Sequence, residues 1–253
     1  MSLTPPEFTV DLARSDDEIR AAQRLRYEVF VEELGASGEG VDHARRLEAD
    51  RFDAHVDHLL LRDVSRADAP VVGVYRLLRE DAAREIGQFY SEDEYDLAPL
   101  RSSGRRLLEL GRSCVHRDYR GGPGLMRLWQ GLSDYVAAHE IELLFGVASF
   151  HGTDVKELAA PLSLLHHRHL APEPLRVRSR VHQPMALCPE DGLDRLEAAR
   201  AIPALIKSYL RLGAVVGDGA FLDHAFNTTD ICLVIDTARL DPRQGALYRR
   251  EAS

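Results

Sequence analysis

The segment from Glu109 to Gly122, with the sequence ELGRSCVHRDYRGG, places charged residues on an apolar strand that leads into a turn rich in arginine and glycine. Glu109 and Arg112 interrupt the apolar run, and burial of a charge is costly unless the charge has a partner. A carboxylate in such a strand could act as a general base in acyl-group transfer. A Glu109–Arg112 ion pair that orders the strand is the alternative, and the residues alone support both interpretations equally.

The turn that follows this strand has the composition of an anion-binding site. Its sequence, RDYRGGPG, precedes LMRLWQGLSDYVAAHE, where apolar residues recur at the spacing of one helix face. A helix N-terminus that follows glycines presents free backbone N–H groups and the positive end of the helix dipole, which suits a phosphate group. An ordinary strand-to-helix turn is the alternative. The segment lacks both the glycine spacing of dinucleotide-binding loops and the lysine of a Walker motif.

Composition and charge argue against several classes of protein. The chain of 253 residues is 45% hydrophobic and 29% charged, which is typical of globular proteins, and its net charge of −9 argues against generic nucleic-acid binding. Three widely spaced cysteines without a CxxC pair predict neither a disulfide framework nor a zinc site. His166, His167 and His169 have no carboxylate or cysteine at ligand spacing, so we expect no metal. No segment resembles an export signal or a membrane span, which predicts a cytoplasmic protein.

Strands and helices alternate along the chain without a repeat, which predicts a single α+β domain over residues 1–253 with a mixed central sheet flanked by helices. A polar stretch with several glycines, about 35–53, predicts a mobile lid, and about 238–253 is expected to form a short C-terminal tail. A capping box of Ser15 and Glu18 opens a helix that is expected to reach about residue 34. Besides the strand around Glu109 and the helix after the turn, we expect strands at 8–12, 55–62, 71–78, 143–150, 214–221 and 231–235, and helices at 154–170 and 203–212.

The order of these elements resembles the GNAT acyltransferase superfamily, in which a strand with a glutamate, an arginine-glycine turn, a helix, another strand and a late YxxxG motif follow one another. Tyr209 and Gly213 form that last motif here. Within the superfamily, the chain is similar over about residues 26–236 to the bacterial ornithine-lipid N-acyltransferases, sometimes named hemolysin-like. The strings that carry this similarity are RYEVF, LEADRFDAHVDHLLLRD, VVGVYRLLRE, FYSEDEYDL, ELGRSCVHRDYRG, LFGVASFHG, IPALIKSYLRLGA and FNTTDICLVID. The resemblance implies a GNAT-like acyltransferase fold.

The resemblance also implies a reaction, the transfer of a 3-hydroxyacyl chain from acyl carrier protein to the α-amino group of ornithine, which gives lyso-ornithine lipid. It implies no cofactor besides the acyl donor, which is 3-hydroxyacyl-acyl carrier protein or an acyl-CoA. The expected partners are acyl carrier protein, ornithine or a similar amino acid, and, through the lipid product, the inner face of the membrane. The alternative enzyme is an acyl-homoserine-lactone synthase or another acyl-CoA-dependent N-acyltransferase. The non-enzymatic alternatives are a protein that only binds the carrier and a hemolysin-like protein.

Candidate site residues follow from matching the motifs of the family to this sequence. The acyl-homoserine-lactone synthases share a pattern with this chain at Arg26, Phe30, Asp50, Asp53, Arg76, Glu109 and Arg112. The resemblance implies catalytic roles for Glu109, Arg112 and Tyr209, of which Tyr209 would protonate the leaving thiolate. It implies that the amino-acid substrate contacts Arg26, Phe30, Asp50, Asp53 and Arg76. It implies that the carrier and its phosphopantetheine arm contact Val115, Arg117, Arg120, Gly121, Gly122 and Gly124, although Tyr119 stands where the superfamily usually has glutamine or arginine.

Overall fold

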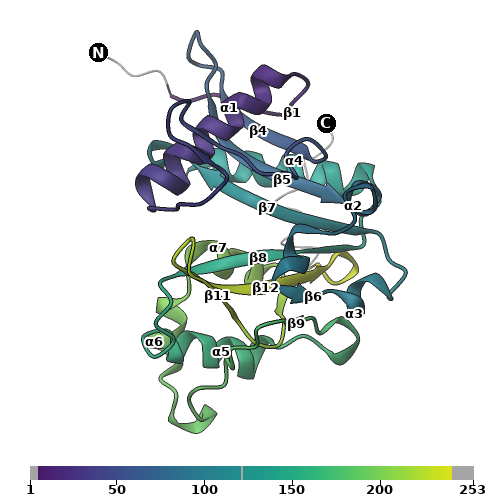
Figure 1. The fold of residues 1–253 in the computed structure, drawn as a ribbon, viewed down its shortest axis with the longest axis vertical. Helices are drawn as coiled ribbons and strands as arrows, with labels where there is room; N and C mark the ends of the chain where they lie inside the picture. Colours follow the sequence, from purple (N-terminus) through teal and green to yellow (C-terminus); the bar gives the residue numbers. More distant parts are fainter. Residues whose placement is uncertain (1–4, 121, 241–253) are drawn as a thin grey trace. The chain divides into compact units, whose positions relative to one another are not determined.

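Residues 5–120 and 122–240 are described by the computed structural model of the chain, and they group into two compact units (Figure 1). The first unit contains the residues up to Ile86 and those from Leu110 to Glu140. The second unit contains Gly87–Glu109 and the described residues from Ile141 onward. Among the described residues, each unit is therefore built from two separate stretches of the chain. The expectation of one domain over residues 1–253 stays a prediction.

The first unit is built on strands in the order β1, β4, β5 and β7, and β4 and β5, the strands expected at 55–62 and 71–78, pair antiparallel. The strands are β1 (Phe8–Leu12), β4 (Asp57–Asp63), β5 (Val71–Arg79) and the later residues of β7 (Leu107–Val115). The helices are α1 (Asp16–Arg26), a π-helix (Tyr27–Glu33), α2 (Glu80–Ile86), a 3-10 helix (Arg117–Tyr119) and α4 (Pro123–Ala138).

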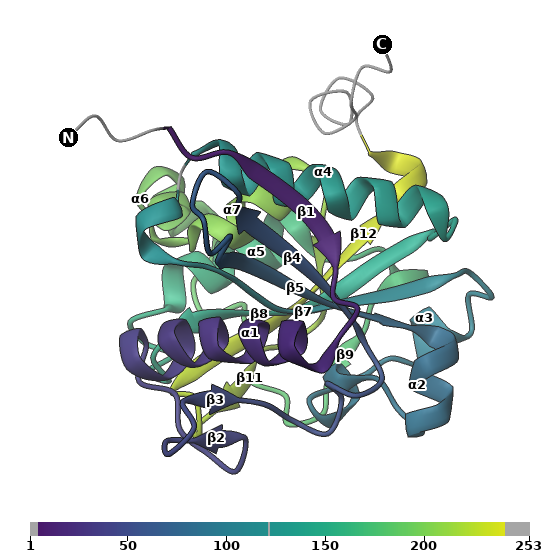
Figure 2. The same ribbon diagram turned by 90° about the horizontal axis from the view of Figure 1, so that it is seen from above.

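Two helices, α1 and α4, cover opposite faces of these strands (Figure 2). Ser15 caps α1 by accepting a hydrogen bond from the Glu18 backbone N–H at 3.3 Å, so the expected helix start is confirmed. On the other face, α4 contacts β1 and β4. The core between α1, the π-helix and the strands consists of Ala22, Leu25, Val29, Leu60, Val74 and Cys114. Because side chains alternate along a strand, β4 can pack against α1 on one face and against α4 on the other.

The helix expected to reach residue 34 changes its form at Tyr27. The α-helix ends at Arg26, and Tyr27–Glu33 follow as a π-helix. Its hydrogen bonds join residues five apart, as between the Leu34 N–H and the Val29 carbonyl at 3.2 Å. Residues four and five apart therefore lie on one face of this segment, an arrangement that the helical periodicity of the sequence did not reveal.

The polar stretch expected to form a lid contains a short antiparallel hairpin of β2 (Val41–Asp42) and β3 (Leu47–Glu48). At its base, the Ala49 N–H donates to the Gly40 carbonyl at 2.8 Å. A Cβ atom on Gly40 would lie only 2.4 Å from the Ala49 carbonyl oxygen, so position 40 has room for glycine alone. The mobility of this segment stays a prediction.

Replacement of Gly40 by alanine is expected to lower the free energy of unfolding by about 1–3 kcal/mol, because the new methyl group would overlap a backbone oxygen. Urea denaturation followed by circular dichroism measures the change. Gly122→Ala is the matched control, since a Cβ atom there meets no atom within 4 Å and the φ angle of −119° suits alanine. Equal losses in the two variants would contradict the steric explanation.

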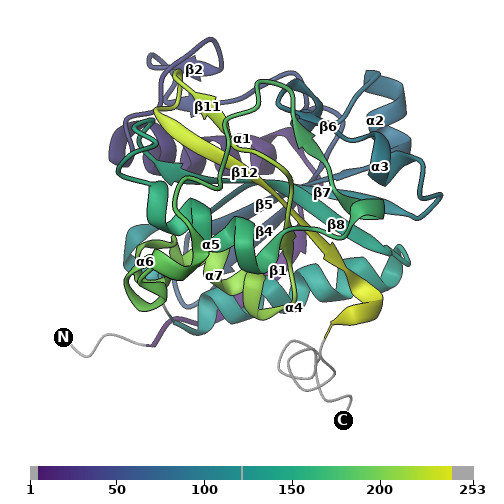
Figure 3. The ribbon, with the colours of Figure 1, turned by 90° about the horizontal axis from the view of Figure 1, so that it is seen from below.

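The second unit contains a mixed sheet, as the sequence predicts. The first residues of β7 pair parallel with β8 (Leu143–His151), and β8 pairs antiparallel with β12 (Thr228–Asp236). The short strands β10 (Val215–Val216) and β11 (Phe221–Asp223) both pair antiparallel with β12. A further pair consists of β6 (Tyr95–Asp96) and β9 (Arg178–Ser179). The helices are α3 (Ala98–Arg101), α5 (Ala159–His169), α6 (Arg195–Ala201) and α7 (Ala204–Arg211), and α5 lies beside α6 (Figure 3).

Most of the expected elements of the second unit are confirmed, with differences at their ends. The strand expected at 214–221 is two short strands, β10 and β11, separated by residues 217–220, and the helix expected from residue 154 begins at Ala159. Among residues 5–120 and 122–240, no helix combines the length and the hydrophobicity needed to cross a membrane. The tail expected at 238–253 lies mostly outside the described residues.

Candidate functional site

Six charged side chains of the first unit form one buried ionic network, which consists of Arg26, Glu48, Asp50, Asp53, Arg76 and Arg112. Arg26, at the end of α1, is fully buried. Its Nε atom donates to Glu48 Oε2 at 2.5 Å, and its Nη1 atom donates to Asp53 Oδ1 at 2.7 Å. A buried guanidinium needs such partners, because an unpaired buried charge is strongly unfavourable.

Two further arginines join the same carboxylates from neighbouring strands. Arg76 on β5 places its Nη1 atom 2.6 Å from Asp50 Oδ2 and 3.1 Å from Asp53 Oδ1. Arg112 on β7 donates from Nε to Glu48 Oε1 at 3.1 Å and from Nη2 to Asp50 Oδ2 at 3.2 Å. Arg112 has a φ angle of 48°, in the left-handed region, so the strand is locally distorted at this residue. The network thus ties residues 48–53 to α1, β5 and β7.

The network keeps its three carboxylates ionised. Burial by itself would raise the pKa of Asp53, but the charges of Arg26 and Arg76 and their hydrogen bonds hold that pKa well below its ordinary value. Burial likewise opposes the ionisation of Glu48 and Asp50, and the neighbouring guanidinium groups again lower both pKa values. Three positive and three negative charges balance, so the network adds no net charge to the interior.

The protein should lose stability at acidic pH because these folded-state pKa values lie below the unfolded ones. The contribution is fully present above the unfolded carboxyl pKa values, at about pH 4, and decreases as the pH falls toward the folded values. Urea unfolding between neutral and acidic pH measures this slope, which should be smaller in Asp53→Asn. Asp134→Asn, at an exposed position of α4, is the control and should keep the parent slope. An unchanged slope in Asp53→Asn would contradict the assignment.

The structure brings together four of the five residues expected to contact the amino-acid substrate, together with Arg112. Arg26, Asp50, Asp53 and Arg76 pair with one another and with Arg112, so their charges are largely taken up within the network. The fifth, Phe30, lies on the π-helix and packs half-buried against the core. Sequence reasoning missed Glu48, although an acid two residues before Asp50 in the same polar stretch was the available signal.

Glu109 belongs to the second unit and has partners that neither interpretation of the sequence included. Its carboxylate is 2% exposed and accepts hydrogen bonds from the backbone N–H groups of Tyr90 at 2.7 Å and Ser91 at 2.6 Å, and from the Ser91 hydroxyl. These groups begin the 3-10 helix Tyr90–Asp93, so Glu109 caps that helix from a distant strand. A role as general base stays a prediction.

Tyr209 lies in α7 of the second unit and is buried. Its carbonyl accepts a hydrogen bond from the Ala214 N–H at 3.0 Å, and Gly213 adopts a φ angle of 89°, which favours glycine. The YxxxG spacing therefore fits the turn that ends α7, in which Gly213 has a positive φ angle and the Tyr209 carbonyl is hydrogen-bonded. Protonation of a thiolate by Tyr209 stays a prediction.

The turn after β7 holds most of the residues expected to contact the carrier arm. Arg120 donates to Glu33 through both Nη atoms, at 2.5 and 2.8 Å, and through Nε to the Val115 carbonyl at 2.9 Å. Gly122 is the N-cap of α4, and no described side chain caps this helix end. Gly124 is buried, and a Cβ atom there would lie 3.2 Å from Phe8 and Leu61, so this glycine serves packing. Arg117 is exposed, Tyr119 donates to Asp63, and Gly121 lies outside the described residues.

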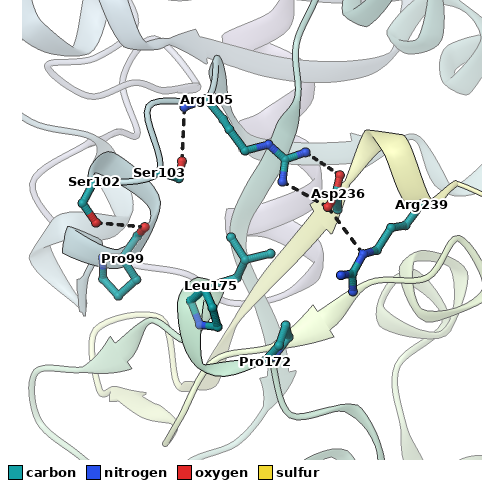
Figure 4. Close-up of a pocket in the computed structure, with 9 residues that line it drawn as sticks. Pro99, Ser102, Ser103, Arg105, Pro172, Leu175, Asp236 and Arg239 are labelled. Atoms are coloured by element: carbon teal, nitrogen blue, oxygen red, sulfur yellow. Dashed lines mark hydrogen bonds and ion pairs between the residues drawn. The ribbon is translucent and has the colours of Figure 1, made fainter.

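A cavity of about 480 Å³ lies in the second unit, and none of the matched residues lines it (Figure 4). Arg105 and Arg239 both pair with Asp236 at its edge. The remaining lining residues are mostly prolines and small side chains, namely Pro99, Ser102, Ser103, Pro172, Pro174 and Leu175. In the part of the chain that the structure describes, no group of three or more histidine, cysteine, aspartate or glutamate residues is arranged to hold a metal ion.

Comparisons with known proteins decide the family. A family model described as an acetyltransferase (GNAT) domain matches residues 25–130. The L-ornithine N(alpha)-acyltransferase of Rhodobacter capsulatus is 58% identical to this chain and covers 99% of it, with 98% of the relative covered. The protein of the same name from Brucella abortus is 43% identical over 96% of this chain and 89% of its own length. The chain belongs to the L-ornithine N(alpha)-acyltransferase family.

Members of the L-ornithine N(alpha)-acyltransferase family are N-acyltransferases, so this chain is an enzyme, and the non-enzymatic interpretations are wrong. A solved CoA-dependent acyl-homoserine lactone synthase is 14% identical to the chain, with a TM-score of 0.54, and covers 96% of this chain and 88% of that one. This likeness concerns the fold alone. The expected GNAT-like fold, with a mixed sheet and flanking helices, is confirmed.

Proposed function

We propose that the enzyme transfers a 3-hydroxyacyl chain from acyl carrier protein to the α-amino group of ornithine and so forms lyso-ornithine lipid. The observation that carries the proposal is the 58% identity over 99% of the chain to a relative named L-ornithine N(alpha)-acyltransferase. The donor and its hydroxyl group follow from the motifs that resemble ornithine-lipid N-acyltransferases. Because the product carries an acyl chain, we expect a cytoplasmic enzyme with a peripheral contact at the inner face of the membrane.

The chemistry needs a proton acceptor and a proton donor. The ornithine nitrogen bonds to the thioester carbonyl carbon, the carbon–sulfur bond breaks, and one proton moves from nitrogen to the departing thiolate. We assign removal of the amine proton to Glu109 and protonation of the thiolate to Tyr209. The support for Glu109 is a buried carboxylate whose orientation is fixed by Tyr90 and Ser91, because a catalytic base must be held in place. No cofactor is required, since amide formation from a thioester involves no redox change.

The N-terminus of α4 is our candidate for the phosphate of the carrier arm. Gly122 leaves open space at this helix end, and no described side chain occupies its free N–H groups. A phosphate there would interact with the positive end of a helix of 16 residues. Arg120 contributes less attraction for this phosphate than a free arginine would, because its guanidinium is paired with Glu33.

Purified enzyme with 3-hydroxyacyl-acyl carrier protein and ornithine should release thiol and form an equal amount of amide, which mass spectrometry identifies as lyso-ornithine lipid. Parallel reactions with S-adenosylmethionine as acceptor and with acyl-CoA as donor test the alternative enzymes. Thiol release with S-adenosylmethionine and none with ornithine would contradict the proposed acceptor. Equal turnover with acyl-CoA would contradict the proposed donor and leave the proposed acceptor unchanged.

A further inference from the structure

The 3-10 helix Tyr90–Asp93, whose first residues hold the carboxylate of Glu109, is itself held by a charged pair in the second unit. Arg101, the last residue of α3, donates from Nε to Glu92 Oε1 at 2.9 Å and from Nη2 to Glu92 Oε2 at 2.6 Å. Two parallel hydrogen bonds of this kind fix the direction of the pair as well as its distance. Glu92 therefore has a defined orientation relative to α3.

Glu92 also contacts the backbone at the point where the 3-10 helix begins. Its Oε2 atom accepts a hydrogen bond at 2.7 Å from the N–H of Phe89, three residues earlier in the chain. Phe89 is fully buried, and the Cζ atom of Arg101 lies 4.7 Å from the centre of its ring. Glu92 and Arg101 thus hold Phe89 in place, and the two residues that follow Phe89 donate the N–H groups that hold Glu109.

Phe89 is anchored next to the strand position that carries Glu109. Its ring packs edge-to-face against Phe145 of β8, with 5.0 Å between the ring centres. Phe145 is also the residue that pairs with Glu109 between the parallel strands β7 and β8. A shift of Phe89 would therefore move the N–H groups that hold the carboxylate.

The pair of Arg101 and Glu92 is charged at neutral pH and partly shielded from water. Burial by itself would raise the pKa of Glu92, but hydrogen bonds from Arg101 and from the Phe89 N–H, together with the charges of Arg101 and Arg180, lower that pKa. The two side chains are only 29% and 18% exposed, so this pair should be stronger than the ion pairs on the surface.

We propose that Arg101 and Glu92 are positioning residues for the reaction, because their ion pair fixes the backbone N–H groups that hold the Glu109 carboxylate. The inference rests on the proposed function, which assigns Glu109 as the acceptor of the amine proton. Backbone N–H groups cannot turn as side chains do, so their position depends on the course of the loop. A catalytic group displaced by about 1 Å can lose about a hundredfold in rate.

In Arg101→Met, kcat for ornithine acylation should fall about ten- to hundredfold, because the base would spend less time in its productive orientation. The KM values for ornithine and for the carrier should stay near those of the parent, since no contact with either substrate is removed. Arg101→Lys keeps the charge but not the two parallel hydrogen bonds, and it should recover part of the loss. Single-turnover rates are measured well below the urea midpoint of each variant, so that all of the enzyme is folded.

A double-mutant cycle separates positioning from a general loss of structure. In the Glu109→Gln background, Arg101→Met should cause no further fall in kcat, because the base through which Arg101 acts is already absent. A merely structural role would lower kcat by the same factor in both backgrounds. Glu92→Gln is a second, milder variant, since its amide oxygen can still accept from the Phe89 N–H while the charge paired with Arg101 is lost. It should show the same dependence on Glu109 with a smaller fall in kcat.

Arg200→Met is the matched control. Arg200 pairs with Glu197 at 2.5 Å in the same unit, but both side chains are exposed, so the variant should keep the parent kcat. If the parent acylates ornithine and Glu109→Gln lowers turnover, but Arg101→Met and Glu92→Gln keep the parent kcat or lower it equally in both backgrounds, the inference is wrong and the proposed function stands. Normal turnover in Glu109→Gln would overturn the inference together with the role of Glu109, and would leave the proposed substrates unchanged. Absence of ornithine acylation by the parent would refute the proposed function and this inference with it.

Discussion

Glu109→Gln is expected to reduce turnover by about a hundred- to ten-thousandfold, the usual effect of losing a general base. The amide has almost the same shape as the carboxylate but cannot accept the amine proton. It would also turn an NH₂ group toward the backbone N–H of Tyr90 or Ser91, because both carboxylate oxygens accept hydrogen bonds. We therefore expect a loss of stability of about 1–3 kcal/mol in addition.

The two effects of Glu109→Gln can be separated. Single-turnover rates are measured well below the unfolding midpoint, and urea denaturation gives the stability of each variant. Ser91→Ala is the matched control, because it removes one donor to Glu109 and leaves the carboxylate in place. It should lose some stability and keep most of its turnover. If Glu109→Gln turns over within a few-fold of the parent, Glu109 acts only as the cap of the 3-10 helix Tyr90–Asp93.

Arg26→Met is expected to lower the free energy of unfolding by about 3–5 kcal/mol, because it removes one buried positive charge and leaves the network with one uncompensated negative charge. Methionine retains much of the side-chain volume, so the loss reports on the charge more than on a cavity. Glu48 and Asp53 would each lose a hydrogen bond from a fully buried guanidinium. Equilibrium urea denaturation at neutral pH measures the change.

Arg20→Met is the control for this experiment. Arg20 pairs with Asp17 on the same helix, but both side chains are exposed, and exposed pairs contribute little. Its free energy of unfolding should match that of the parent within experimental error. A similar small change in Arg26→Met would mean that water or a rearranged partner compensates the buried carboxylates, and that the network is not a major source of stability.

The elements set by local pattern could be predicted from the sequence. Ser15 caps α1 as its spacing to Glu18 indicates, and the apolar runs of β4, β5 and β8 are strands. The π-helix could not be predicted, because a continuous helical pattern does not distinguish hydrogen bonds that join residues four apart from those that join residues five apart. The strand expected at 214–221 is divided because Asp218 and Ala220 pair with Arg178 and Gln183 instead of with β12.

The residue types of the candidate site could be predicted from the sequence, but the contacts between these side chains and their partners could not. A general base and an ion pair with Arg112 were the two interpretations of Glu109, and neither included its contacts with Tyr90 and Ser91, which precede it by 19 and 18 residues. Such contacts depend on how a loop folds back on a strand, and no local pattern encodes that. Glu48 was missed for the same reason, since it is an acid in a polar stretch that becomes buried only when Arg26 and Arg112 reach it.

The buried ionic network also limits how this sequence can change during evolution. A single substitution that removes one of the six charges leaves the buried network with one net uncompensated charge, so sequences that lack one member should be disfavoured by selection. Replacement of the whole set by apolar residues would carry no such penalty. The six positions should therefore be inherited as a block. The part of the pattern that also resembles the acyl-homoserine-lactone synthases would then record a shared scaffold, and families with different acceptors could keep it while their acceptor pockets diverge.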